Sequence, residues 1–193
     1  MALAVPVGLP AERRKSNPEP EVAMRKIPSL LWIAILSAAG TFAGTAAGEE
    51  NDPATLIRAL QGAKATLQGG LQASEGEGQP ISGKFEIEDG KLQLSVYTMK
   101  NGSFMEVVLD PVTGVIAKSE KITEGDDLKA AKEQSAAIAK AKRSLRAATE
   151  TAIASNAGAR AVSIVPELKG ARPVGQITLE QGGNIKKIEA PLD

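Results

Sequence analysis

The side chains that most often carry out protein chemistry are largely missing from this chain of 193 residues. It contains no histidine and no cysteine, which excludes Ser-His-Asp triads, cysteine nucleophiles and the common zinc sites. A serine–lysine dyad stays open on composition, because Ser82, Ser103 and Ser119 all have lysines nearby in the sequence. We interpret these serines as turn and strand-surface residues. We therefore expect a protein that is not an enzyme and that binds no cofactor or metal.

Two short patterns in the first half of the chain suggest a ligand. Residues 78–84 have the spacing of a phosphate-binding loop, but Phe85 stands where a hydroxyl would hold magnesium, and a strand rather than a helix is expected next. Glu86, Glu88 and Asp89 form an acidic cluster that could bind calcium weakly, although no EF-hand pattern surrounds it. We interpret the first pattern as a chance match and the second as the solvated face of a strand.

A basic cluster in the second half consists of Lys140, Lys142, Arg143 and Arg146. Such a cluster is typical of the water-facing side of an amphipathic helix, and we favour that interpretation over the docking of an anionic partner. Over the whole chain, 23 basic residues balance 23 acidic ones. No excess of charge therefore attracts the protein to nucleic acid.

The elements that would position these residues are clearest around a predicted hairpin. Residues 92–99 and 104–109 alternate between apolar and polar side chains, as expected for half-buried strands. Asn101 and Gly102 lie between the two runs and readily adopt the positive φ angles of a tight hairpin turn. The pattern predicts an antiparallel β-hairpin.

A second turn directly follows the hairpin. The carboxylate of Asp110 can cap this turn, Pro111 fixes φ, and Gly114 supplies a left-handed position after Thr113. We assign these residues, with the hairpin pair, to the shape of the chain and not to catalysis. A further strand is expected after the turn, which extends the hairpin into a meander.

Two helical regions are expected, one before each group of strands. Asp52 and Pro53 begin the first, whose apolar residues share one face as far as residue 71, and Gly69-Gly70 weakens its end. The second begins at Asp126-Asp127 and extends to about residue 156, with a break near Ser135 because such a length is unusual. Strands are then expected at residues 161–165, 174–179 and 184–190.

Together these patterns predict an α+β fold of two units, each with a helix packed on a small antiparallel β-meander. The first unit covers residues 48–122 and the second residues 123–193, and the pattern recurs at a spacing of about 80 residues. The second unit ends before a counterpart of the turn at Asp110, so its final strand is absent or borrowed. The units either form separate lobes or pair their sheets into one body.

Residues 1–47 are predicted to be an N-terminal extension and signal peptide. A short basic start at residues 24–26 precedes an apolar stretch at 30–39 and small residues at 43–47, as in secretory signals. Cleavage after Ala47 would produce a periplasmic or secreted protein. The alternative is an N-terminal membrane anchor, because no charge occurs between Lys26 and Glu49. Translation could begin at Met1 or Met24.

Residues 102–116, a hydrophobic strand that ends in the Asp-x-x-Thr-Gly turn, resemble the PepSY domain family. The resemblance covers residues 53–121, and residues 126–193 form a divergent second copy that ends before any Thr-Gly. It implies a helix followed by a small antiparallel sheet. The family occurs in propeptides of secreted metallopeptidases and in stand-alone envelope proteins, which implies a binding or inhibitory role towards extracytoplasmic peptidases.

The expected function is therefore that of an exported, non-enzymatic binding module that engages or restrains a peptidase or another protein of the cell envelope. The alternative is a structural or stress-related envelope protein that acts by self-association. A membrane is a partner only if the signal segment is retained as an anchor. The residues that we expect at the partner surface are Tyr97, Met99, Phe104 and Met105.

Overall fold

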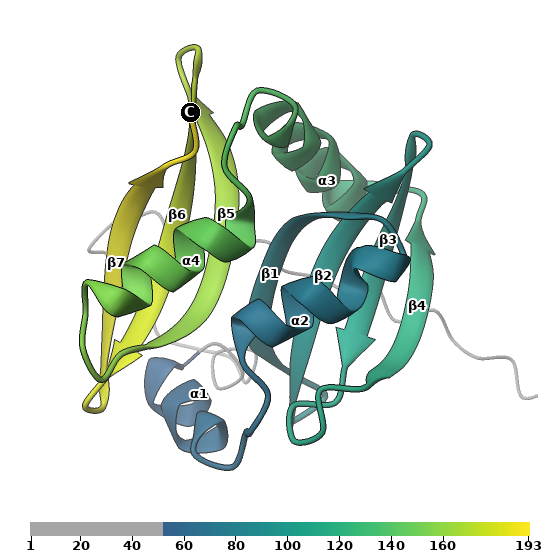
Figure 1. Ribbon diagram of the computed structural model, residues 1–193. Coiled ribbons are helices and arrows are strands. Elements are labelled where there is room, and N and C mark those ends of the chain that lie inside the picture. The colour runs from purple at the N-terminus through teal and green to yellow at the C-terminus, as the bar shows by residue number, and fades with distance from the viewer. Residues whose placement is uncertain (1–51) are drawn as a thin grey trace, which may run out of the picture.

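A single antiparallel sheet of seven strands organises the computed structural model, which describes residues 52–193 (Figure 1). The strand order is β4-β3-β2-β1-β5-β6-β7, so that two meanders join side by side. The elements in chain order are α1 (Pro53–Leu60), α2 (Leu67–Ala73), the short 3-10 turn η1 (Ser74–Gly76), β1 (Gln79–Glu88), β2 (Lys91–Lys100), β3 (Ser103–Leu109), β4 (Ile116–Ile122), α3 (Gly125–Ile138), α4 (Leu145–Ala154), β5 (Arg160–Lys169), β6 (Arg172–Gln181) and β7 (Asn184–Pro191).

The fold class is α+β, as the alternation and the turn residues predict. The two meanders meet where β1 pairs with β5, with Gly83 opposite Ile164 and Lys84 opposite Ser163. The halves of the described chain therefore share one sheet and are not separate lobes.

Both helical regions are interrupted, an interruption that was not expected in the first region and that was expected a few residues earlier in the second. The first separates into α1 and α2, and the side chain of Thr66 accepts a hydrogen bond from the backbone N–H of Gly69 to begin α2. The second separates into α3 and α4 after Ile138 rather than near Ser135, and Ser144 caps α4. A side-chain cap satisfies backbone donors that are left open at a helix start, which stabilises a new helix at each of these positions.

Backbone hydrogen bonds fix both helix interruptions to the sheet. The carbonyl of Pro111 accepts from the N–H groups of Lys64 and Ala65, at 3.0 and 2.9 Å. In the second half, the carbonyl of Leu192 accepts from Lys142 and Arg143, at 2.7 and 3.0 Å. These contacts involve residues far apart in the sequence, which explains why helical periodicity does not reveal the interruptions.

Helices α2 and α4 cover one face of the sheet and lie in front of it in Figure 1. We call this the front face. Their buried residues Leu67, Leu71 and Leu145 pack into the main hydrophobic core. At Gly83 an added Cβ would lie 3.1 Å from Leu67 and 3.3 Å from Leu71, and at Gly70 it would clash with Leu94. The glycines thus allow the helix and the sheet to approach each other closely.

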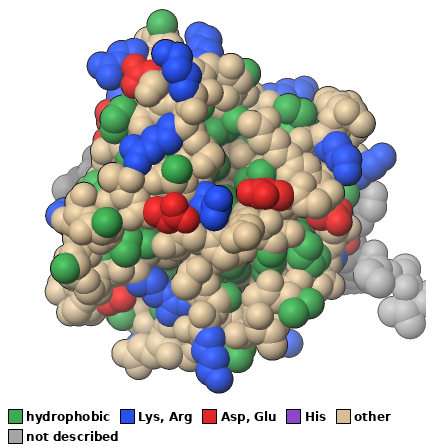
Figure 2. All heavy atoms as spheres, in the orientation of Figure 1, with side chains coloured by type: hydrophobic (Ala, Val, Ile, Leu, Met, Phe, Trp, Pro, Cys, Tyr) green, Lys and Arg blue, Asp and Glu red, His purple; other side chains and the backbone are tan. Residues whose placement is uncertain are grey.

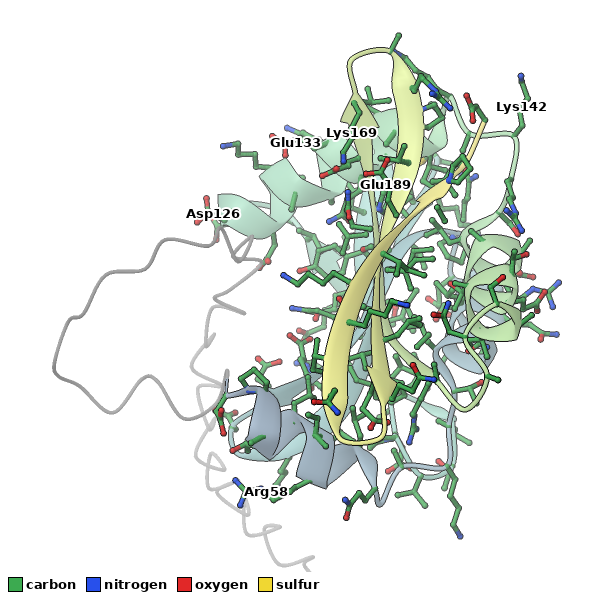
Figure 3. All side chains as sticks on the ribbon, turned by 90° about the vertical axis from the view of Figure 1, so that its left-hand side faces the viewer. Arg58, Asp126, Glu133, Lys142, Lys169 and Glu189 are labelled. Carbon is green, nitrogen blue, oxygen red and sulfur yellow. The ribbon has the colours of Figure 1, made fainter. Side chains whose placement is uncertain are left out.

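Helix α3 lies on the opposite side of the sheet, which we call the back face, and contacts β1, β5 and β6. Figure 3, turned by 90° from Figure 1, shows α3 and α4 on opposite sides of the strands. Among residues 52–193, no helix is long and apolar enough to cross a membrane. The predicted signal peptide or membrane anchor in residues 1–47 lies outside the described residues.

The two halves have the same strand registers at an offset of 81 residues. The ladder between β1 and β2 shifts register between Pro80 and Ser82, and the ladder between β5 and β6 shifts between Ala161 and Ser163. At the same offset, the ladder of β2 with β3 matches that of β6 with β7. Strand β4 pairs with the outer edge of β3, whereas no described strand pairs with the outer edge of β7.

Candidate binding face on strands β1 to β4

A group of three carboxylates lies on the back face of the first meander. Because Gly83 faces the helices on the front side, alternation places Glu86 and Glu88 of β1 on the back face. Strand pairing sets Glu86 opposite Gln93 and Tyr97 opposite Glu106 of β3. We call Glu86, Glu88 and Glu106 the carboxylate cluster.

Hydrogen bonds connect the members of this cluster on β1 to the neighbouring strand. The side-chain amide of Gln93 donates to Glu88 and lies 3.3 Å from Glu86 Oε1. Lys84 forms an ion pair with Glu86, and both side chains are largely shielded, at 17 and 22% exposure. Lys118 of β4 also interacts with the charges of Glu106 and Glu88 while it pairs with Glu120, so carboxylates still outnumber lysines around the cluster.

The electrostatic consequence is greatest at Glu106. Burial is the largest cause that raises the pKa of Glu106 to about 7, followed by the negative charges of Glu86 and Glu88, and a hydrogen bond from Ser95 and the charge of Lys84 oppose the rise. Burial, followed by the charge of Glu86, also raises the pKa of Glu88. The cluster is therefore stabilised by protons or by added positive charge.

Helix α3 borders this face through a hydrogen bond to Tyr97. The Tyr97 hydroxyl donates to Asp127 Oδ1 at 2.8 Å, and burial raises the pKa of that carboxyl. The Tyr97 side chain is fully buried, so the prediction that it contributes to a partner surface is wrong. Its aromatic ring is enclosed by the fold, where the hydroxyl has a partner of its own.

The other three residues expected at the partner surface do not share one face. Met99 pairs with Phe104, on the same side as the carboxylate cluster, and both are half-buried against the core. Met105 pairs with Thr98 and therefore points to the front side. Alternation along β3 causes this separation. The back face thus combines two half-buried apolar side chains with the carboxylates.

The predicted hairpin turn has the backbone conformation that a two-residue loop requires. Asn101 and Gly102 have φ values of 53° and 77°, and they connect β2 to β3 with Lys100 opposite Ser103. Positive φ at both positions matches the twist of the flanking strands. The turn fixes the register that brings Glu106 opposite Tyr97.

The second turn is organised by Asp110. Its Oδ1 accepts from the N–H groups of Val112 at 3.0 Å and Thr113 at 2.7 Å, and from the Thr113 hydroxyl at 2.8 Å. Hydrogen bonds to the ionised form, foremost those from Thr113, lower the pKa of Asp110. Gly114 completes the turn with φ 73°. Pro111, beside the cap, supplies the carbonyl that fixes the first helix interruption.

The serines that composition leaves open for catalysis lie in different surroundings. Ser82 is buried, and its hydroxyl has no hydrogen-bond partner within residues 52–193. Ser103 begins β3 beside the hairpin turn, and the Ser119 hydroxyl donates to Glu77 at 3.0 Å.

Of the two short ligand-like patterns, only the first takes an ordinary place in the fold, because Glu86 and Glu88 of the second are half-buried and do not form the solvated strand face that was expected. The residues that resemble a phosphate-binding loop run from Gly78 into strand β1, and β2 follows after the tight turn at Asp89-Gly90. Within residues 52–193, no group of three or more acidic residues is arranged to hold a metal ion. Glu86 and Glu88 contact polar side chains of β1 and β2 instead.

The basic cluster lies at the link between α3 and α4 and not along one helix. Its members Lys142, Arg143 and Arg146 line a groove of about 370 Å³ together with the acidic Glu75. The Arg143 guanidinium donates to the carbonyl of Ala147 at 3.1 Å. In the space-filling view, basic and acidic side chains are interspersed over this side of the molecule (Figure 2). Basic side chains thus outnumber acidic ones in the lining of the groove.

Arg160 is a key contact that the sequence does not reveal. Its Nη1 donates to the carbonyls of Leu60 at 2.7 Å and Ala63 at 3.1 Å, and its Nη2 donates to Ala65 at 2.7 Å. The guanidinium lies 5.1 Å from the centre of the Phe85 ring, and burial lowers its pKa. Arg160 thus ties the first helix interruption to β5. An arginine at the start of a strand carries no signal of such contacts.

Comparison of the chain with models of known protein families, with curated proteins and with solved structures gave no match.

Proposed function

We propose that this protein is an exported, non-enzymatic binding module built from two PepSY-like units. The proposal rests on the strand-and-turn sequence of residues 102–116 and on its setting, in which helices precede a meander in each half. The partner is a protein of the cell envelope, an extracytoplasmic peptidase or another envelope protein. The N-terminal signal is removed on export, and the module acts outside the cytoplasm.

The observation that carries the binding role is the carboxylate cluster on the back face. Half-buried carboxylates that outnumber the neighbouring lysines are costly for the fold alone. A lysine or arginine of a partner would add positive charge beside these carboxylates and would lower the pKa of Glu106. Half-buried Met99 and Phe104 lie on the same face and would add apolar contact area at the rim. A basic segment of the partner is therefore the chemistry that fits.

The test is a capture experiment with three forms of the purified protein, immobilised and exposed to an envelope extract. We expect the wild type to enrich one protein that then binds directly when purified. The double variant Glu86→Gln, Glu106→Gln should lose it, because the negative charge of the cluster is reduced. The variant Glu167→Gln is the matched control, because Glu167 lies 81 residues after Glu86 at the equivalent position of β5. Equal binding by all three forms, or enrichment of no protein, would contradict the proposal.

A further inference from the structure

We infer that the outer edge of β7 pairs with β7 of a second copy of this chain, in an antiparallel arrangement centred on Ile188. This interface lies at the opposite end of the sheet from β4. It is additional to the binding of a partner at the carboxylate cluster and does not depend on it.

The comparison between the two halves shows what β7 lacks. Strand β3 has β2 on one side and β4 on the other, whereas β7 has only β6 among the described strands. Val107 of β3 is fully buried, while Ile188, its counterpart 81 residues later, is half-buried. An edge strand exposes unpaired N–H and C=O groups, which favour the addition of another strand.

The charges along β7 are complementary to those of a second β7. Lys187 and Glu189 flank Ile188 and share the back face, since they pair with Thr178 and Gln176. An antiparallel pair centred on Ile188 would place Lys187 of each copy opposite Glu189 of the other, so that two attractive cross-strand pairs form at once.

Neighbouring side chains hold Glu189 in place for this role. Lys169 forms an ion pair with Glu189, and Gln176 donates to it at 3.2 Å. Figure 3 shows Lys169 and Glu189 pointing toward one another over the strands. These contacts lower the pKa of Glu189, with the hydrogen bond from Lys169 as the largest cause. Lys187 forms no ion pair with any of residues 52–193, so its charge remains available.

The opposite edge of the sheet is a weaker candidate for the same pairing. The middle residues of β4 are exposed on both of its faces, so a second strand would gain little apolar contact there. Lysines on an edge strand disfavour indiscriminate strand addition. A second copy of the chain would instead place its Glu189 opposite Lys187. A symmetric dimer is also the commonest closed assembly of identical chains.

A single introduced cysteine tests the geometry, because the chain has none of its own. Residues directly opposite in an antiparallel pair have Cα atoms about 4.5–5.5 Å apart, which lies within disulfide range. Ile188→Cys should therefore form a covalent dimer under mild oxidation. Ser119→Cys, at the middle of β4, is the matched control and should stay monomeric. Absence of the Ile188→Cys dimer, or equal cross-linking of both variants, would overturn the inference.

Charge reversal provides a second test that keeps Ile188 intact. Lys187→Glu and Glu189→Lys should each weaken the dimer about tenfold or more in sedimentation velocity, because two attractive pairs become repulsive. An equimolar mixture of the two variants should restore the dimer, since opposite charges then face each other again. A wild type that is monomeric at every concentration would overturn the inference.

Discussion

At the scale of single residues, Glu106 is the most informative side chain. Its pKa is raised from an ordinary 4.5 to about 7, chiefly by burial and then by Glu86 and Glu88. The carboxyl of Glu106 thus has a lower pKa in the unfolded chain than in the folded protein, so the unfolded chain loses this proton at a lower pH. The free energy of unfolding therefore falls between pH 4.5 and pH 7 and stays lower above that range.

Glu106→Gln should remove this pH-dependent penalty. We expect the variant to gain on the order of 2 kcal/mol of unfolding free energy over the wild type at pH 8, and clearly less at pH 5. Chemical denaturation at the two pH values measures both differences. A gain that is the same at both pH values would show that the Glu106 carboxyl does not titrate in this range.

Arg160 provides a second prediction at the same scale. Arg160→Met keeps most of the aliphatic stem but removes the donors for the carbonyls of Leu60, Ala63 and Ala65. We expect a loss of about 2–4 kcal/mol in unfolding free energy, because polar groups in a part-buried link lose their partners. Arg58→Met on the exposed side of α1 is the control and should change stability little. Similar losses in both variants would contradict the assigned role.

At the scale of elements, the turn at Asp110 shows how much local sequence determines. Gly114 has φ 73°, a conformation that costs a residue with a branched Cβ a substantial amount of energy. Gly114→Val should lower the melting temperature by several degrees, measured by circular dichroism. Gly76→Val is the control, because Gly76 has no positive φ and open space around it. An unchanged melting curve for Gly114→Val would contradict the turn.

The positions of the strands were predictable from sequence, although β5 extends four residues beyond its expected end at residue 165, whereas the helices were predictable only in part. Alternation and turn residues act over a few positions, so β2 and β3 lie within one residue of their expected bounds. The helix interruptions depend on the carbonyls of Pro111 and Leu192, which approach from the sheet. Thr66 and Ser144 are suitable helix caps, but an apolar stripe continues across both positions and hides that signal.

The candidate site was less predictable than the fold. Glu86 and Glu88 stand out in the sequence as an acidic pair, but Glu106 joins them only through the register of three strands. The burial that raises the pKa of Glu106 is likewise a property of the assembled sheet. Tyr97 was expected at the partner surface. Strand alternation does not show that helix α3, which follows later in the sequence, brings Asp127 to the Tyr97 hydroxyl.

At the scale of the whole molecule, the main feature is the joining of two similar halves in one sheet. The junction depends on two paired positions, Gly83 with Ile164 and Lys84 with Ser163. Helices α2 and α4 then cover the front side of both meanders. Pairing between equivalent strands of two halves is a long-range contact, so sequence alone left separate lobes and one body equally open. The arrangement leaves β4 and β7 as the edges.

The two faces of the sheet differ in their chemistry. Helices α2 and α4 cover the front face, while the back face of the first meander carries the carboxylate cluster beside α3. Binding of a basic segment there should strengthen as pH rises through about 7, because the cluster then carries its full negative charge. Isothermal titration with the captured partner at pH 6 and pH 8 measures this, and stronger binding at pH 6 would contradict it.

The most direct measurement of the central claim is proximity labelling in intact cells, with the labelling enzyme fused to the C-terminus. If the module binds an envelope protein through its carboxylate cluster, the wild type and Glu167→Gln should label the same envelope protein. The double variant Glu86→Gln, Glu106→Gln should not label it. Labelling of cytoplasmic proteins alone, or an identical set of labelled proteins for all three forms, would contradict the account.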